Sequence, residues 1–218
     1  MIFLTFNTIT ELLCLLAAVL FLSKDKDPAW RLAIIYMALT CLGECTGIYV
    51  RRCLHQPNYP VYNTLLLFEC AYLSFFFKCL FRSLGKNSNW LLAWFPLFFA
   101  VYIVELCYVH PADFADTTAS FMSVFFVLLS LYFYYLLITG EKLLELWSYP
   151  EFWWASGALF FYFGSTVCNT FFNYLSQDRI AVFNHSIRYL VFNLLNLILY
   201  GCWSYAFLCR YRQRNSLT

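Results

Sequence analysis

The sequence predicts an all-α membrane protein, a single bundle of seven transmembrane helices with the N-terminus outside the cell and the C-terminus in the cytoplasm. Composition is the first supporting observation: 62% of the 218 residues are hydrophobic and 12% are charged, about half the charged share of a soluble domain. The second is that apolar runs long enough to cross about 30 Å of hydrocarbon recur along the chain. A soluble globular protein and a disordered chain are both excluded, because each would need more charge.

The predicted spans are separated by short breaks rich in the charged residues, Pro, Gly and Asn that end helices. They cover residues 2–23, 30–50, 60–84, 90–110, 117–139, 151–175 and 185–209. The breaks read SKDKDPA, RRCLHQPN, GKNSN, HPADFAD, GEKLLELWSYP and SQDRIAVFN. None is long enough to fold separately, so we expect one domain over residues 1–218.

Each span carries signals of its own. The first lacks the basic start and the cleavage site of a signal peptide, and Glu11 interrupts it, so we expect it to remain in the mature protein. Pro28, Pro60 and Pro150 fit the starts of the second, third and sixth helices, where a missing N–H costs little. Pro96 lies inside the fourth span and predicts a kink. The fifth span is mainly aromatic and is expected to contact lipid, whereas the seventh leads into the basic tail RYRQRNSLT.

The lysines and arginines predict the orientation. With the N-terminus outside, ten basic residues fall in cytoplasmic segments and four in outer segments, which satisfies the positive-inside rule. The ten are Lys24, Lys26, Arg31, Lys78, Arg82, Lys86, Lys142, Arg210, Arg212 and Arg214, and the four are Arg51, Arg52, Arg179 and Arg188. The net charge of +2 provides no basic field for a nucleic acid, which we therefore exclude as a partner.

Polar groups inside the spans gather in the outer half of the predicted membrane. A charged residue there costs about 2.5 to 3.5 kcal/mol on the insertion scale, so each one needs a partner or a function. Glu105 is one of four such glutamates. The candidate ligand-binding residues are Glu11, Glu44, Asn63, Glu69, Asn169, Arg188, Asn193 and Asn196. Arg188 is the only strongly basic residue placed to pair with three of these glutamates, and one arginine cannot neutralise all three. The alternative is that the polar groups only join helices, at about 0.6 kcal/mol per hydrogen bond.

The histidines and the cysteines are the remaining residues with site chemistry. His55, His110 and His185 fall at the outer ends of helices and are weak candidates for a metal site in a membrane-embedded lipid hydrolase, although no HxxxH or HExxH pattern is present. We expect no cofactor. Most of the ten cysteines lie in apolar runs, where cysteine acts as a small hydrophobe. Cys53 and Cys107 lie near span ends on the same side, where a single disulfide is one alternative.

Several segments resemble a group of small bacterial seven-helix integral membrane proteins that have no assigned activity. The resemblance rests on Glu44-x-x-Gly47-x-Tyr49, on Tyr62-Asn63 followed by Phe68-Glu69, on Pro150-x-Phe152-Trp153-x-x-x-Gly157 with Tyr162-x-Gly164, and on Asn193-x-x-Asn196-x-x-x-Tyr200. It extends over nearly the whole chain. The resemblance implies a multi-pass protein of the bacterial inner membrane, and it supplies no catalytic residue or substrate.

These observations favour a receptor-like or sensory protein that binds a small or lipid-like ligand in an outer-half polar pocket. Its partners would be membrane lipid, the ligand and a separate cytoplasmic signalling protein, because the cytoplasmic segments are too short for a catalytic domain. The alternatives are a small proton-coupled transporter, in which Glu69 would titrate, and the lipid hydrolase.

Overall fold

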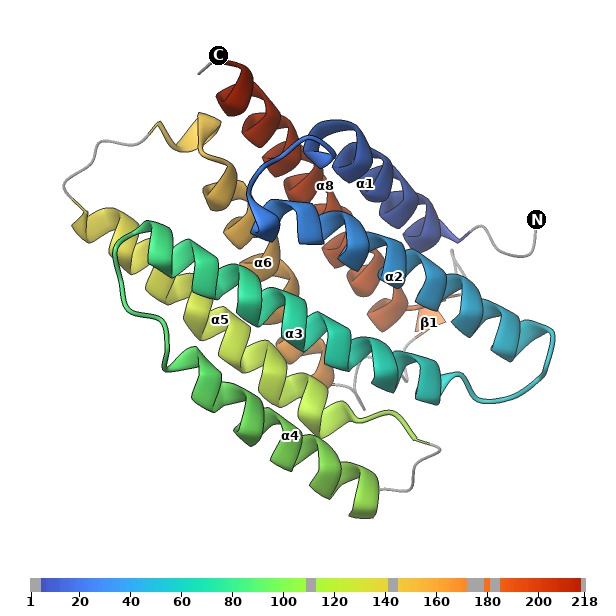
Figure 1. Ribbon diagram of the computed structural model, residues 1–218. Coiled ribbons are helices and arrows are strands. Elements are labelled where there is room, and N and C mark those ends of the chain that lie inside the picture. Colours follow the sequence, from blue (N-terminus) through green and yellow to red (C-terminus); the bar gives the residue numbers. More distant parts are fainter. Residues whose placement is uncertain (1–4, 109–112, 141–144, 172–178, 181–184, 217–218) are drawn as a thin grey trace.

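The structure, a computed structural model, describes residues 5–108, 113–140, 145–171, 179–180 and 185–216. Within these residues it contains seven α-helices (Figure 1). They are α1 (Phe6–Leu22), α2 (Pro28–Arg52), α3 (Tyr59–Ser83), α4 (Leu91–Tyr108), α5 (Asp116–Thr139), α6 (Pro150–Thr170) and α8 (Ile187–Ser216). A 3-10 turn, η1 (Leu146–Ser148), precedes α6, and the two-residue strands β1 (Arg179–Ile180) and β2 (His185–Ser186) pair antiparallel before α8. The predicted all-α class is confirmed.

Five of the helices are long and apolar enough to cross a membrane: α2, α3, α4, α5 and the part of α8 from Tyr189 to Ser216. α1 is a shorter apolar helix of 17 residues. The chain is therefore a multi-pass helical membrane protein. α6 was predicted as a span but is not one of these five. Its sequence contains many small and polar residues, and one of its faces is buried in the bundle. Trp154, Ala155 and Ala158 are completely buried, whereas Phe160 and Phe163 are exposed.

The helices form one bundle in which the first and last helices are neighbours. α1 packs on both α2 and α8, α8 packs on α6, and α6 packs on α5. α2 packs on α3, which contacts α5, and α4 lies against α5 at the edge of the bundle (Figure 1). This arrangement places α1, α2, α3, α6 and α8 around a common interior.

Local sequence explains where several helices begin. The Thr5 hydroxyl accepts a hydrogen bond from the Thr8 N–H at 3.2 Å, and the Asp27 carboxylate accepts one from the Ala29 N–H at 2.9 Å. These side chains satisfy N–H groups that the first turn leaves free. Proline in the first turn of α2, α3 and α6 agrees with the prediction. Pro96 lies inside α4, as expected.

A close approach between α6 and α8 depends on Gly157. A Cβ atom at this position would lie 3.1 Å from the Leu199 carbonyl oxygen and 3.0 Å from the Cys202 Cβ. Small residues let two helix backbones approach closely, which is a common way of joining helices in membranes. The contact holds α8 against α6.

Stacked aromatic rings fill part of the interior of the bundle. The Trp154 and Trp203 rings are parallel with centroids 5.6 Å apart, and Phe76 stacks on Trp154 at 3.8 Å. Tyr36 stacks on Tyr72 at 4.3 Å, and the Trp203 Nε1 donates to the Trp154 carbonyl at 3.1 Å. We call Tyr36, Tyr72, Phe76, Trp154 and Trp203 the aromatic layer. Its rings come from α2, α3, α6 and α8 and join these four helices.

Candidate functional site

Three glutamates from three helices face the same interior. Glu11 on α1 is 5% exposed, and its carboxyl is close enough to that of Glu44 on α2 for the two charges to repel. The Tyr200 hydroxyl on α8 lies within hydrogen-bonding reach of Glu11. Tyr36 interacts electrostatically with both Glu69 on α3 and Glu11. The structure therefore brings Glu11, Glu44 and Glu69 together, and we refer to them as the carboxyl cluster.

Tyrosine hydroxyls hold two of these carboxyls. The Tyr62 hydroxyl donates to Glu44 Oε2 at 2.9 Å, and the Tyr162 hydroxyl donates to Glu69 Oε1 at 2.5 Å. A phenol O–H offers one donor to a carboxylate and stabilises its charge without adding a cation. Neither tyrosine was among the predicted binding residues. Helical spacing was the available signal, because Tyr62 and Glu69 are two turns apart on α3.

Three buried oxygen atoms in this region accept no hydrogen bond from any described residue. They are Asn7 Oδ1 and Glu11 Oε2 on α1, and Asn193 Oδ1 on α8. Asn7 and Glu11 are one helical turn apart on the same face of α1, which packs on α8. A buried acceptor without a donor costs about 1 to 3 kcal/mol, and more when it is charged. Three acceptors on the α1–α8 side of the interior are therefore unsatisfied by the described residues.

Asn63, a predicted pocket residue, has a structural role. It is 3% exposed, and its Nδ2 donates to the Asp113 carbonyl at 3.0 Å. Its Oδ1 accepts from the Ala115 N–H at 3.1 Å, and its own carbonyl accepts from the Tyr102 hydroxyl at 3.2 Å. Both ends of the side-chain amide are thus occupied in fixing the segment that leads into α5.

The other predicted polar residues divide between this interior and its edge. Asn169 on α6 donates from Nδ2 to the Ser120 Oγ on α5 at 3.2 Å, which ties these two helices. Asn196 is partly buried, one turn before Tyr200 on α8. The backbone of Arg188 belongs to α8, but its side chain lies outside the described residues. The predicted pairing of Arg188 with the glutamates therefore stays a prediction.

The fourth intramembrane glutamate, Glu105, caps a helix. Its carboxylate accepts hydrogen bonds from the Thr117 N–H at 2.8 Å, from the Thr118 N–H at 2.6 Å, and from the Thr118 hydroxyl. These N–H groups belong to the first turn of α5, where backbone donors are free and a negative charge is favourable. Glu105 is thus explained by the architecture and does not belong to the carboxyl cluster.

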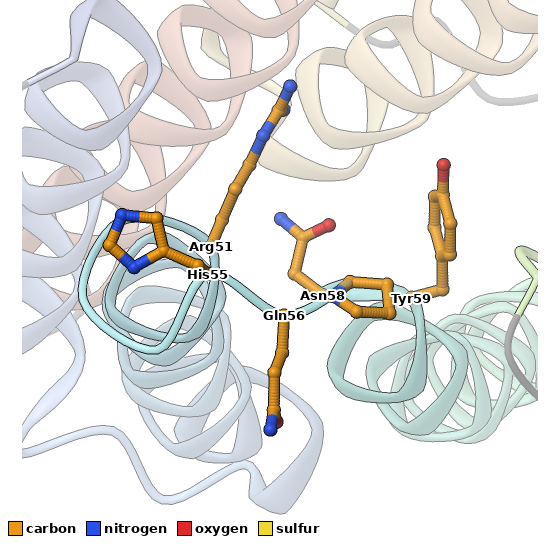
Figure 2. Close-up of a pocket in the computed structure, with 6 residues that line it drawn as sticks. Arg51, His55, Gln56, Asn58 and Tyr59 are labelled. Atoms are coloured by element: carbon orange, nitrogen blue, oxygen red, sulfur yellow. The ribbon is translucent and has the colours of Figure 1, made fainter.

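An open pocket of about 380 Å³ lies at the turn between α2 and α3 (Figure 2). Figure 2 shows Arg51, Asn58 and Tyr59 extending to one side of this turn and Gln56 to the opposite side. Arg51 is near enough to Tyr62, the partner of Glu44, to interact with it electrostatically. The residues lining the pocket are Arg51, His55, Gln56, Pro57, Asn58 and Tyr59. Sequence patterns gave no signal for this pocket, because it is formed by a turn.

The histidines give no support to a metal site. His55 adopts a left-handed backbone conformation with φ of 55° in the α2–α3 turn. His110 and the side chain of His185 lie outside the described residues. In the part of the chain that the structure describes, no group of three or more His, Cys, Asp and Glu side chains is arranged to hold a metal ion. The ten cysteines are free, so the alternative of a disulfide between Cys53 and Cys107 is wrong.

At the far end of the bundle, charged residues join the α1–α2 turn to α8. Arg210 Nε lies 2.9 Å from Asp25 Oδ2, and Arg210 Nη2 lies 3.7 Å from Asp27 Oδ2. Arg214 Nη1 lies 3.7 Å from Asp25 Oδ2. Burial opposes ionisation of Asp25, but hydrogen bonds from Arg210 and the Asp27 N–H hold its pKa below its ordinary value. We call Asp25, Asp27, Arg210 and Arg214 the ion-pair cluster.

The polar site and the ion-pair cluster are separated by the aromatic layer. Along α8, Tyr200 beside the carboxyl cluster is followed by Trp203 and then by Arg210. Along α6, Trp154 lies about two turns before Tyr162. The interior is therefore built in three levels, polar, aromatic and ionic, and α8 contributes to all three.

Comparison of the chain with protein-family models, curated proteins and solved structures finds no match.

Proposed function

We propose that this protein is a receptor-like or sensory membrane protein that binds a small or lipid-like ligand beside Glu11. The observation that carries the proposal is the buried Glu11 Oε2, which has no donor among the described residues, together with the similar oxygens of Asn7 and Asn193. Acceptors in excess fit a ligand that brings donors, either a cationic amine or a hydroxyl-bearing group. Such a ligand would replace the missing hydrogen bonds and offset the repulsion between Glu11 and Glu44.

The aromatic layer and the ion-pair cluster favour a receptor over a carrier. Ring stacking around Trp154 lies between the carboxyl cluster and the Asp25–Arg210 ion pair at the opposite end of the bundle. A ligand bound to Asn193 at one end of α8 would act on the same rigid helix that carries Arg210 near its other end. A small movement of α8 could then change the ion-pair cluster, which a separate cytoplasmic partner would detect.

The direct test is ligand-dependent stabilisation of the purified full chain in detergent. The probes are a panel of small primary and quaternary amines, a panel of polyols, and carboxylic acids as the unfavourable class. We expect amines or polyols to raise the melting temperature, because a ligand that binds only the folded state stabilises it. Stabilisation by the carboxylic acids alone would contradict the proposal.

Glu11→Gln separates binding from folding. The amide cannot ionise and supplies a donor, so we expect a higher melting temperature without ligand. Affinity for the stabilising amine or polyol should fall at least about tenfold, which is about 1.4 kcal/mol. Glu145→Gln, at an exposed position before η1, is the control and should change neither quantity. Unchanged affinity in Glu11→Gln would exclude Glu11 as a ligand-binding residue.

The proton-coupled transporter is the second candidate, and the Tyr162–Glu69 hydrogen bond is the observation in its favour. A carboxyl that alternates between a phenol partner and a bound proton could couple proton movement to transport. Uptake by reconstituted vesicles that follows a pH gradient, and that disappears in Glu69→Gln, would support this function. Stabilisation by a ligand that is never transported would instead support the receptor.

A further inference from the structure

A second pocket lies on the outside of the bundle, where α1 ends and α2 begins. It has a volume of about 470 Å³ and is formed by the last turn of α1, the turn after it and the first two turns of α2. Its apolar lining residues include Val19, Leu32 and Ile35, and its polar lining residues are Ser23, Lys26 and Arg31. The pocket does not overlap the carboxyl cluster or the pocket at the α2–α3 turn.

The apolar wall of this pocket faces outward. Val19 is 43% exposed, Leu32 is 37% exposed and Ile35 is 57% exposed. On helices that cross a membrane, exposed apolar side chains of this kind contact acyl chains of the lipid. The apolar part of the pocket is therefore a groove open to the hydrocarbon of the bilayer.

The two cations at the end of the groove are available to a ligand. Lys26 and Arg31 are exposed, and within the described residues neither forms an ion pair. The neighbouring acids are engaged elsewhere: Asp25 pairs with Arg210 and Arg214, and Asp27 pairs with Arg210 and caps α2. Since α8 neutralises both carboxylates of the turn, the positive charge of Lys26 and Arg31 remains uncompensated.

We propose that this groove binds one anionic phospholipid. Its phosphate would lie between Lys26 and Arg31, with the Ser23 hydroxyl as a further donor, and an acyl chain would follow Val19, Leu32 and Ile35. Basic side chains directly beside the membrane attract anionic headgroups, and the apolar wall fits a chain and not a soluble anion. An apolar wall continuous with two cations matches the amphipathic shape of a phospholipid more closely than that of a peptide.

The site has a consequence for the turn that forms it. A lipid headgroup held by Lys26 and Arg31 would fix the α1–α2 turn, which also carries Asp25 and Asp27 of the ion-pair cluster. Lipid composition would then influence the end of α8. This inference does not depend on the ligand proposed beside Glu11.

Native mass spectrometry of the full chain, released from nanodiscs with equal amounts of phosphatidylglycerol and phosphatidylcholine, tests the proposal. We expect phosphatidylglycerol to be retained preferentially. Lys26→Gln with Arg31→Gln should reduce its retention about tenfold or more, since each basic residue near a membrane surface contributes substantially to anionic lipid binding. Inorganic phosphate in the buffer should not displace it, because the acyl chain contributes to binding; displacement would point to a simple anion site and overturn the proposal.

The matched control is Lys86→Gln with Arg212→Gln, which removes the same charge from exposed positions outside the groove. It should leave retention unchanged, and the charge-conserving pair Lys26→Arg with Arg31→Lys should restore most of it. Equal losses in the test and control variants would mean that only net charge matters and would overturn the proposal. The melting temperature in lipid-free detergent checks the fold of each variant. If the double variant melts lower than its control, Lys26→Gln and Arg31→Gln are measured separately, and each should show part of the loss.

Discussion

At the residue scale, the glutamates of the interior differ in what they contact. Glu105 receives hydrogen bonds from the first turn of α5, and Glu69 and Glu44 each accept from a tyrosine hydroxyl. Glu11 has one buried oxygen without a partner among the described residues. The same residue type therefore serves as a helix cap, as a partner for a phenol and as a candidate ligand-binding group. Only contacts in three dimensions distinguish these roles.

Tyr162→Phe tests the contribution of a tyrosine to the carboxyl cluster. The substitution removes the donor to Glu69 Oε1 and keeps the ring. We expect the free energy of unfolding to fall by about 1.5 to 3 kcal/mol, the usual range for a hydrogen bond to a charged group. Tyr135→Phe, at a position 61% exposed on α5, is the control and should lie within about 0.5 kcal/mol of the wild type.

Denaturation in mixed micelles measures both variants. A loss in Tyr162→Phe no larger than that in Tyr135→Phe would mean that the phenol contributes nothing to folding stability.

At the scale of single elements, α6 was predicted as an apolar span but is less apolar than the five long helices. The predicted start of α6 differs by one residue from the observed start, because Pro150 occupies the first turn. α6 is nevertheless not one of the five long apolar helices. Gly157 and the completely buried Ala158 let neighbouring helices approach, whereas Trp154 fills the space beside them. The small residues of α6 thus reflect contact with protein on one face, whereas Phe160 and Phe163 on another face are exposed.

Gly157→Ala tests this contact. The new Cβ would lie 3.1 Å from a backbone oxygen of α8, so one helix must move, and overpacking of this kind costs about 1 to 3 kcal/mol. Gly201→Ala on α8 is the matched control, because no atom lies within 4 Å of the added Cβ. Removing a flexible glycine there should be neutral or stabilising by up to about 1 kcal/mol.

The comparison is made by thermal unfolding of the two variants beside the wild type. If both variants lost the same stability, the close α6–α8 contact at Gly157 would not explain the effect.

At the scale of the whole molecule, sequence periodicity predicted the helices well and the contacts between them poorly. The predicted spans 60–84 and 117–139 differ by one residue or less at each end from α3 and α5. α8 continues past the predicted end at residue 209 to Ser216, because Arg210 and Arg214, one turn apart, both reach Asp25. Apolar length sets where a helix enters the membrane, and an ion pair across the bundle extends it.

The candidate site also shows that the sequence predicts helices better than the contacts between them. Helical spacing and charge brought Glu11, Glu44 and Glu69 to attention, and the structure gathers them. Asn63 was assigned to the same site, but its partners Asp113 and Ala115 lie 50 and 52 residues away in the sequence. Contacts over such separations leave no periodic trace in a single sequence.

The ion-pair cluster predicts how stability depends on pH. The pKa of Asp25 is lower in the folded protein than its ordinary value of 3.8, so the unfolded chain takes up this proton first as the pH falls. The contribution of Asp25 is therefore fully present above pH 3.8 and is lost as the pH falls through the lower folded pKa. Melting temperatures measured across this acidic window should fall more steeply for the wild type than for Asp25→Asn. Parallel curves would mean that the Asp25–Arg210 pair adds no pH-dependent stability.

The neighbouring positions of α1 and α8 also bear on the order of assembly in the membrane. α1 packs against α8, so Glu11 and Asn7 meet their neighbours on α8 only after the residues between the two helices have been synthesised. A chain that stops before α8 would keep these polar groups, and the unpaired Asp25, exposed to lipid or to water at its edge. The contact between α1 and α8 would therefore distinguish a chain that contains α8 from one that stops before it.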